Sequence, residues 1–188
     1  MKLKTTVGVS NRHIHLCEND FKILFGDTTL TKLRDINQLG QFAANEVVCL
    51  KTEKNTIENV RIIGPLRNYT QVEISKTDSY FLGLNPPIRK SGDIKGSESI
   101  TIMGPKGEIT IQEGCIIANR HVHFTKKMAE EYNLVDDQKI VVRINTEKSG
   151  TIEAFVKISD DAYFEMHLDT DDANAFLLKN NDEVDLII

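Results

Sequence analysis

The chain has 188 residues, of which 40% are hydrophobic and 27% charged, and its formal net charge is -5 at pH 7. This length can form one large or two small domains, and the negative charge argues against nonspecific nucleic-acid binding, which depends on lysine and arginine. No apolar run reaches the ~20 residues of a membrane span, and residues 1–7 lack the apolar stretch of a secretory signal. We therefore expect a cytoplasmic protein with no nucleic-acid or membrane partner.

Most of the chain consists of short runs of valine, isoleucine and threonine separated by turn residues such as Gly64-Pro65 and Gly104-Pro105. Regularly spaced short strands are typical of barrels and sandwiches. The predicted elements, in chain order, are a helix at 18–25, strands at 60–63, 71–75, 100–103 and 109–111, a helix at 126–132, a strand at 140–144, a helix from 170 and a strand at 184–188. The predicted helices are short and serve as caps on a mainly β protein.

Local signals define the ends of these helices. Gly26 is expected in the left-handed conformation after the first helix, Thr125 is a predicted N-cap and Asn133 a predicted stop. Asp171 and Asp172 in the first turn of the last helix suit its positive end.

The three cysteines, Cys17, Cys49 and Cys115, are odd in number and far apart. They suggest neither a disulfide framework nor a thiolate zinc cluster, so each is expected to be a small buried residue. Cys17 lies two residues beyond His15 and is kept as a candidate extra ligand.

All five histidines lie in three places, and four of them form His-x-His pairs that follow the same Asn-Arg dipeptide: Asn11 to His15 and Asn119 to His123. In a strand, His-x-His directs both imidazoles to one face. The repeated motif implies two related halves. We expect two similar small β-barrels, residues 2–11 with 119–188 and residues 12–118, with the active site in the cleft between them.

Five histidines are too many for one catalytic zinc, which takes three protein ligands and keeps one position open. With one carboxylate added, six ligands divide into two open sites of three. Glu73 is a candidate because strand alternation places it opposite Val72 and Ile74. The same alternation fits a solvated strand glutamate equally well.

Colinear motifs over nearly the whole chain resemble the Pdu-type phosphotransacylases, also called phosphate propanoyltransferases. The matching segments are Val7–Leu16, Gly40–Glu46, Ile57–Arg67, Thr70–Ser75, Asn119–His123 and Glu165–Asn174. The resemblance implies a pair of β-barrels and a reversible reaction of an acyl-CoA, such as acetyl- or propanoyl-CoA, with inorganic phosphate. The products are an acyl phosphate and coenzyme A.

The resemblance also implies roles for individual residues. One zinc would be held by His13, His15 and Glu73, with the coenzyme A sulfur at its free position. A second zinc would be held by His121, His123 and His167 and completed by water or phosphate. Arg67 would bind phosphate as a catalytic residue, and the residues implied in coenzyme A binding are Ser10, Lys54, Arg61 and Asn174. Around Lys54 the sequence departs from the family's usual Gly-Pro-Lys-Gly turn. We expect direct attack of phosphate on the acyl carbon, without an acyl-enzyme.

Three other classes of protein explain the histidine motifs less well. A cupin-like mononuclear metalloenzyme explains one His-x-His pair and not the second. A binuclear zinc hydrolase on a (β/α)8 barrel needs more residues and helices. A non-enzymatic zinc-stabilised barrel would more often have four ligands rich in cysteine.

Only nine residues precede Ser10, fewer than the ~12 of a marginally stable helix. Members of the family that work inside bacterial microcompartments often carry an extra N-terminal amphipathic segment, so the resemblance favours the free cytoplasm over a microcompartment lumen. A homo-oligomer, or microcompartment association through another surface, stays open. Acyl-chain preference and physiological direction are not encoded in any local pattern.

Overall fold

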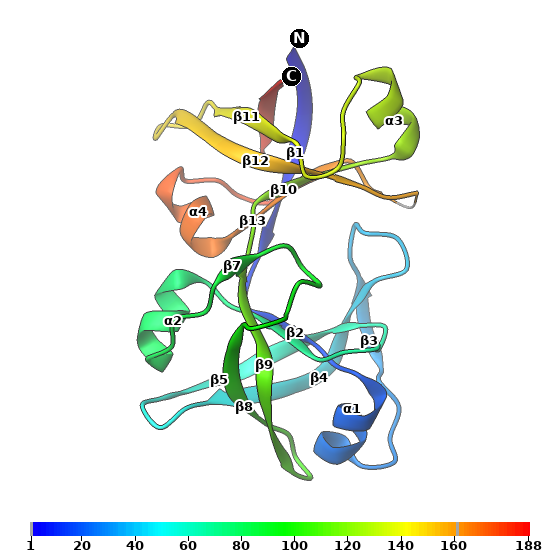
Figure 1. The fold of residues 1–188 in the computed structure, drawn as a ribbon, viewed down its shortest axis with the longest axis vertical. Coiled ribbons are helices and arrows are strands. Elements are labelled where there is room, and N and C mark those ends of the chain that lie inside the picture. The colour runs from blue at the N-terminus through cyan, green and yellow to red at the C-terminus, as the bar shows by residue number, and fades with distance from the viewer. Residues whose placement is uncertain (1, 161) are drawn as a thin grey trace. The chain divides into compact units, whose positions relative to one another are not determined.

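The computed structural model describes residues 2–160 and 162–188, and the chain divides into two compact units (Figure 1). Unit 1 comprises Met1–Asn11 and Asn119–Ile188, and unit 2 comprises Arg12–Ala118. Each unit contains a closed ring of strands and short helices, which confirms the predicted mainly β fold with two barrels. None of the helices in the described residues has the length and apolar character needed to cross a membrane.

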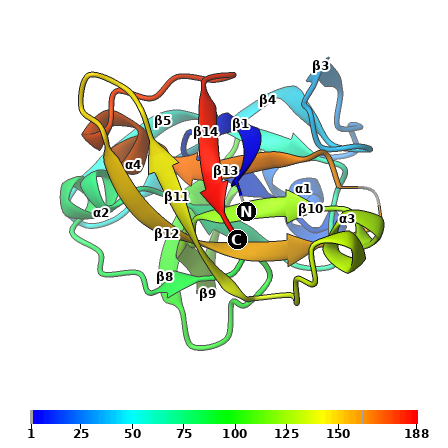
Figure 2. The same ribbon diagram turned by 90° about the horizontal axis from the view of Figure 1, so that it is seen from above.

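Unit 1 is a closed six-stranded barrel with the strand order β1-β13-β10-β12-β11-β14 (Figure 2). Its strands are β1 (Lys2–Ser10), β10 (His121–Phe124), β11 (Lys139–Ile144), β12 (Gly150–Ile158), β13 (Glu165–Asp169) and β14 (Glu183–Ile187). The helices α3 (Lys126–Glu131) and α4 (Thr170–Ala175) follow β10 and β13. Because β1 and β14 pair antiparallel, with Lys2 opposite Ile187, the first and last described strands close the barrel side by side.

Unit 2 contains an eight-stranded sheet in which six strands also form a ring. Its strands are β2 (His13–His15), β3 (Lys32–Asp35), β4 (Phe42–Lys51), β5 (Thr56–Gly64), β6 (Gln71–Glu73), β7 (Ile88–Arg89), β8 (Glu98–Met103) and β9 (Glu108–Ala118). The order is β3-β4-β5-β2-β6-β9-β7, and β8 pairs with both β4 and β9, which closes the ring. The helices are α1 (Glu18–Phe25) and α2 (Lys76–Leu82).

The two rings share one pairing scheme. In unit 2, β2 pairs parallel with β5 and antiparallel with β6. In unit 1, β10 pairs parallel with β12 and antiparallel with β13. Each His-x-His strand therefore occupies an equivalent place in its own barrel. The strand that precedes it in the chain belongs to the other unit in both cases, since β1 lies in unit 1 and β9 in unit 2.

Alternation along the central strands separates the core from the polar face. Ile14 and Val72 are fully buried in the core of unit 2, and Val122 and Met166 are fully buried in the core of unit 1. Since neighbouring strand residues point to opposite faces, the histidines flanking Ile14 and Val122 point away from the cores. This confirms that each His-x-His pair shares one face of a strand.

The three predicted helices are present. The first ends before Gly26, whose φ of 78° is positive although its ψ of -155° lies outside the left-handed helical region. Thr125 caps α3 by accepting a hydrogen bond from the Met128 N–H. The last helix begins at Thr170, as expected, and its N-cap is the Asp169 side chain.

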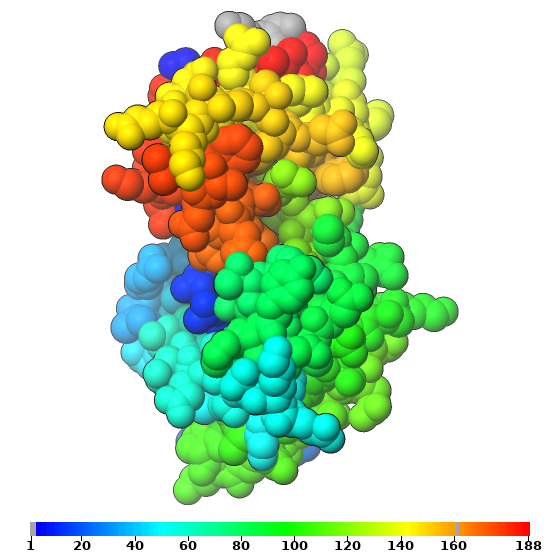
Figure 3. All heavy atoms as spheres, turned by 90° about the vertical axis from the view of Figure 1, so that its left-hand side faces the viewer, coloured from blue at the N-terminus to red at the C-terminus, as the bar shows by residue number. Residues whose placement is uncertain are grey.

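Helix α2 was not predicted from the sequence, and the strand predicted before it is too long. The strand predicted at 71–75 ends at Glu73, because Ser75 is the N-cap of α2 and forms a capping box with Asp78. Gly83 ends the helix in the left-handed conformation. The buried side chains of α2 are Asp78, Ser79 and Leu82, whereas Tyr80 and Phe81 are exposed, so the apolar residues of the helix do not mark its buried face. In the space-filling view, α2 (green) and α4 (orange) both lie on the surface of their own units (Figure 3).

Candidate metal centres and phosphate site

The first candidate metal centre lies in unit 2 and joins strands β2 and β6. One ligand atom from each of His13, His15 and Glu73 lies within 4.8 Å of the others. The antiparallel register places His13 opposite Glu73, and His13 Nε2 lies 3.5 Å from Glu73 Oε2. His15 Nδ1 lies 3.0 Å from the Ile63 carbonyl oxygen. If Nδ1 donates its proton there, the lone pair of Nε2 is available to a metal.

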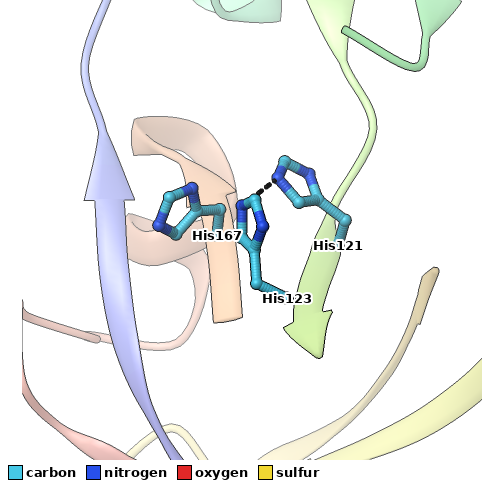
Figure 4. Close-up of side chains that lie close together, drawn as sticks. All are labelled: His121, His123 and His167. Atoms are coloured by element: carbon cyan, nitrogen blue, oxygen red, sulfur yellow. Dashed lines mark hydrogen bonds between the residues drawn. The ribbon is translucent and has the colours of Figure 1, made fainter. Parts of the chain in front are cut away.

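The second candidate centre lies in unit 1 and joins β10 and β13. His121, His123 and His167 again offer ligand atoms within 4.8 Å of one another. Figure 4 shows the three imidazoles gathered together, with His121 Nε2 and His123 Nε2 3.1 Å apart. His121 is opposite His167 in the register, as His13 is opposite Glu73 in unit 2. His121 Nδ1 lies 2.8 Å from the Asn119 carbonyl oxygen, so its Nε2 can present a lone pair to the centre of the cluster.

Burial keeps several of these imidazoles neutral. Burial, and then the neighbouring His13, lowers the pKa of His15 to about 3. Burial followed by His167 lowers the pKa of His123 to about 3, and burial holds the pKa of His121 well below its ordinary value. Neutral imidazole is the form that binds metal ions. The three rings are therefore in the ligating state at neutral pH.

The donor sets fit zinc. Two imidazoles with a carboxylate, or three imidazoles, are the ligand sets of open catalytic zinc sites, which keep a fourth position for water or substrate. His123 Nδ1 is buried and has no hydrogen-bond partner within the described part of the chain. Metal binding at these clusters stays a prediction.

Arg67 lies beside the first cluster, in unit 2. Its backbone N–H donates to the Leu16 carbonyl oxygen at 2.8 Å, and Arg67 forms an isolated β-bridge with Cys17, two residues beyond His15. Its Nη1 lies 3.5 Å from the Tyr69 hydroxyl, and its guanidinium carbon lies 6.0 Å from the Tyr69 ring centroid. Its charge contributes to lowering the pKa of His15. A guanidinium held here is suited to binding an anion such as phosphate.

The residues predicted to bind coenzyme A are divided between the units. Ser10 ends β1 and Asn174 lies in α4, both in unit 1. Arg61 lies opposite His13 in unit 2 and donates from Nη1 to the carbonyl oxygens of Ala44 and Asn45, at 3.0 and 2.9 Å. The Lys54 ammonium donates to the Tyr80 carbonyl oxygen at 2.8 Å, near the C-terminal end of α2. Their coenzyme A roles stay predictions.

The cysteines are all free. Cys115 is buried as expected, and burial raises the pKa of its thiol to about 12. Cys17 and Cys49 are only half-buried, so the prediction of buried residues is wrong for these two. Cys17 occupies the N-cap position of α1, where it makes no side-chain cap hydrogen bond, and it is not part of the cluster formed by His13, His15 and Glu73.

Several contacts around the clusters were not predicted from the sequence. Arg12 and Arg120, which precede the two His-x-His pairs, form ion pairs with Asp78 of α2 and Asp172 of α4. The spacing Ser75-x-x-Asp78 and Asp169-x-x-Asp172 was the available signal, because it is typical of helix N-termini. The residues that hydrogen-bond the third ligands are Gln71, Ser91 and Glu165. Two of these stand two positions before Glu73 and His167, where strand alternation could have indicated them.

Comparison with known proteins shows the family. The family model described as phosphate propanoyltransferase matches residues 6–179. A phosphate propanoyltransferase of Thermotoga maritima is 43% identical over 184 residues, covering 96% of this chain and 88% of the relative. Proteins of the same name from Priestia megaterium and Lachnoclostridium phytofermentans are each 48% identical, covering 94% and 90% of this chain and 82% and 80% of the relatives. The chain, with its two barrels and paired His-x-His motifs, therefore belongs to the phosphate propanoyltransferase family.

Proposed function

We propose that the chain transfers a short acyl group between coenzyme A and inorganic phosphate. A phosphate oxygen forms a bond to the acyl carbon, the carbon–sulfur bond breaks, and the proton released by phosphate passes to the departing coenzyme A thiolate. The products are an acyl phosphate and coenzyme A, and the reaction is reversible. Propanoyl-CoA is the first substrate to test, because the relatives are named for propanoyl transfer.

The observation that carries this proposal is the pair of three-ligand clusters built on equivalent strands. Each cluster combines a His-x-His pair with a third ligand opposite the first histidine. We assign one zinc to His13, His15 and Glu73, and a second zinc to the three histidines of unit 1. Two clusters favour this assignment over a cupin-like enzyme with one metal ion, and family membership favours an enzyme over a non-enzymatic barrel.

The zinc ions, when bound, would supply Lewis-acid chemistry, which stabilises negative charge on the carbonyl oxygen and on the departing thiolate. The protein residues provide the binding and orientation. The low pKa values of His15 and His123 keep both imidazoles neutral in the ordinary pH range, so protons do not compete with metal ions there.

Arg67 is assigned to phosphate. Its guanidinium can bind two phosphate oxygens through paired hydrogen bonds, and the Tyr69 hydroxyl helps to hold it. Fixing phosphate beside the thioester replaces a bimolecular encounter by a positioned one. Since phosphate itself supplies the attacking oxygen, the proposal requires no nucleophile from the protein and no acyl-enzyme.

The proposal also requires the two clusters, Arg67 and the four coenzyme A candidates to act on one pair of substrates. Paramagnetic ions test this requirement directly. In protein loaded with two Mn²⁺ or Co²⁺ ions, magnetic coupling between the ions is expected in the electron paramagnetic resonance spectrum. Spectra that equal the sum of two isolated ions would contradict this requirement.

The cytoplasmic location also stays a prediction.

Release of coenzyme A thiol from a series of short acyl-CoA substrates tests the reaction itself. Release should require phosphate, stop after treatment with a chelator and return when zinc is added. Thiol release at the same rate without phosphate would indicate a hydrolase instead. With acyl-labelled substrate, no label should stay on the protein, and retained label would overturn direct attack.

A further inference from the structure

In both units, the residue two positions before the third ligand forms a hydrogen bond with that ligand. Gln71 precedes Glu73 on β6, and Glu165 precedes His167 on β13. These strands are equivalent, since each pairs antiparallel with the His-x-His strand of its unit. Alternation places the residue and the ligand on the same face. The chemical types differ, however: an amide precedes the carboxylate ligand in unit 2, and a carboxylate precedes the imidazole ligand in unit 1.

In unit 2, hydrogen-bond donors surround one oxygen of the carboxylate ligand. Gln71 is fully buried, and its Nε2 donates to Glu73 Oε1 at 2.6 Å and to Ser91 Oγ at 2.9 Å. Ser91 Oγ in turn donates to Glu73 Oε1 at 2.9 Å. The Gly92 N–H donates to Gln71 Oε1 at 2.7 Å, which fixes the amide so that its nitrogen faces the glutamate. With Oε1 occupied by two donors, Oε2 is the oxygen directed to His13.

In unit 1, the third ligand is an imidazole and its neighbour is an acceptor. Glu165 is 3% exposed, and its Oε2 lies 2.8 Å from His167 Nε2. A carboxylate accepts the Nε2 proton, so Nδ1 of His167 is left as the metal-binding atom. Gly8 lies opposite His167 on β1, and a Cβ atom there would lie 2.6 Å from Glu165 Oε2. The absence of a side chain at Gly8 therefore provides the room for this pair.

We propose that Gln71 and Glu165 are equivalent positioning residues whose hydrogen-bonding character is matched to the ligand that each one holds. An amide donor, assisted by Ser91, fixes Glu73 as a one-oxygen ligand, and a carboxylate acceptor fixes the tautomer and ring orientation of His167. The inference rests on the proposed function, because it requires the two clusters to bind metal ions. It adds the rule that the ligand and its neighbour must be exchanged together.

An exchange experiment in unit 2 tests the rule. In Gln71→Glu, two carboxylates face each other, and zinc affinity of this site should fall by about 100-fold, the upper range for outer-shell changes. The Glu73→His variant should also bind zinc weakly, because the Gln71 amide nitrogen, whose orientation is fixed by the Gly92 N–H, then faces an imidazole. The double variant Gln71→Glu/Glu73→His recreates the pair found in unit 1. It should regain zinc affinity to within about 10-fold of the wild type, a non-additive rescue.

The readouts are zinc affinity by competition with a chromophoric chelator, bound zinc per chain, and the visible spectrum of the Co²⁺ form. The unit 1 ion should be retained in all three variants. Gln138→Glu is the matched control, because Gln138 is a half-buried glutamine whose Oε1 accepts from the Val135 N–H, as a carboxylate also can. If Gln71→Glu does not fold, Ser91→Ala serves in its place. It removes one of two donors to Glu73 and should weaken zinc binding by about 10-fold.

The outcomes distinguish failure of the pairing rule from failure of the proposed reaction. Two zinc ions in the wild type, weak binding in both single variants and rescue in the double variant would support the pairing rule. If the wild type binds two ions, full zinc affinity in the single variant that is tested, Gln71→Glu or Ser91→Ala, would overturn the rule. Absence of rescue in the double variant would also overturn it. Either result would leave the proposed reaction intact. A folded wild-type protein that binds no zinc would overturn both.

Discussion

The two units place a His-x-His pair and a third ligand on the same arrangement of three strands, yet the carboxylate at each cluster has a different role. In unit 2 the Glu73 carboxylate is itself a candidate ligand. In unit 1 the three candidate ligands are imidazoles, and the Glu165 carboxylate lies 2.8 Å from His167 Nε2 as the partner of a ligand. Lys157, which is opposite His123 on β12, contributes to lowering the pKa of His121 and His123 and places a positive charge beside the unit 1 cluster.

This difference indicates how a duplicated framework can serve two roles. In the proposed reaction, the three-imidazole cluster of unit 1 would take a water molecule or a phosphate oxygen, and the cluster of unit 2 that contains a carboxylate would take the thiolate that must also depart. Arg67 supplies a positive charge near the unit 2 cluster. The assignment of coenzyme A sulfur and phosphate to different ions is a proposal that variants can test.

The largest effect is expected when one ligand is removed from either unit. His15→Ala and His123→Ala should each lose one of two zinc ions, because each leaves only two protein ligands in its cluster. Turnover should fall by more than the ~100-fold reached by changes outside the ligand shell. Metal analysis and thiol-release rates measure both effects. Loss of both ions from either variant would show that the clusters are not independent, and Arg143→Ala, an exposed change, is the control.

Removal of the charged side chain beside each cluster should affect phosphate binding to a different degree in the two units. Arg67→Ala should raise the phosphate Michaelis constant about 10- to 100-fold, the equivalent of a charge-assisted hydrogen bond, and should lower turnover. Lys157→Ala should raise the constant at most about fivefold, as expected for a charge without direct contact. Initial rates at varied phosphate measure both constants. Equal effects of Arg67→Ala and the exposed control Arg34→Ala would exclude the phosphate assignment.

A single methyl group at Gly8 should affect unit 1 alone. The added Cβ of Gly8→Ala would lie 2.6 Å from Glu165 Oε2 and 3.0 Å from His167 Cδ2, so the pair must move. We expect about 10-fold weaker zinc binding in unit 1 and unchanged binding in unit 2, measured by chelator competition. The equivalent position opposite Glu73 is Ile116, which shows that unit 2 has no such requirement. Lys4→Ala on the same strand controls for general effects, and equal affinity in both variants would contradict the steric argument.

The sequence predicted the histidine pairs because strand alternation is a local property, but it could not select Glu73. Alternation placed Glu73 on a polar face, as it would any solvated strand glutamate, and only the pairing of β6 with β2 brings it opposite His13. Long-range pairing of this kind has no local signal. Resemblance to the family supplied the choice instead. Helix α2 was missed for another reason, since two of its apolar side chains, Tyr80 and Phe81, are exposed while the polar Asp78 and Ser79 are buried, which gives no amphipathic pattern.

The smallest effects should come from the ion pairs that connect each His-x-His strand to a helix. In unit 2, Arg12 makes two short contacts with Asp78, at 2.8 and 3.0 Å, and the Asp78 side chain is 6% exposed. In unit 1, Arg120 Nε lies 3.5 Å from the Asp172 carboxylate, which is 29% exposed. Because the first pair is less exposed to solvent and is joined by two contacts, it should be the stronger ion pair.

Double-mutant cycles on the free energy of unfolding measure this difference. With Arg12→Gln and Asp78→Asn, we expect a coupling of about 1 to 3 kcal/mol, and with Arg120→Gln and Asp172→Asn less than about 1 kcal/mol. Asp78 also belongs to the capping box of α2, so its single variant includes a helix-capping cost that the cycle removes. Equal couplings would mean that the second pair closes to the geometry of the first. In that case the arginine before each histidine pair would have the same structural role in both units, and the difference between the units would be confined to the third ligand and its neighbour.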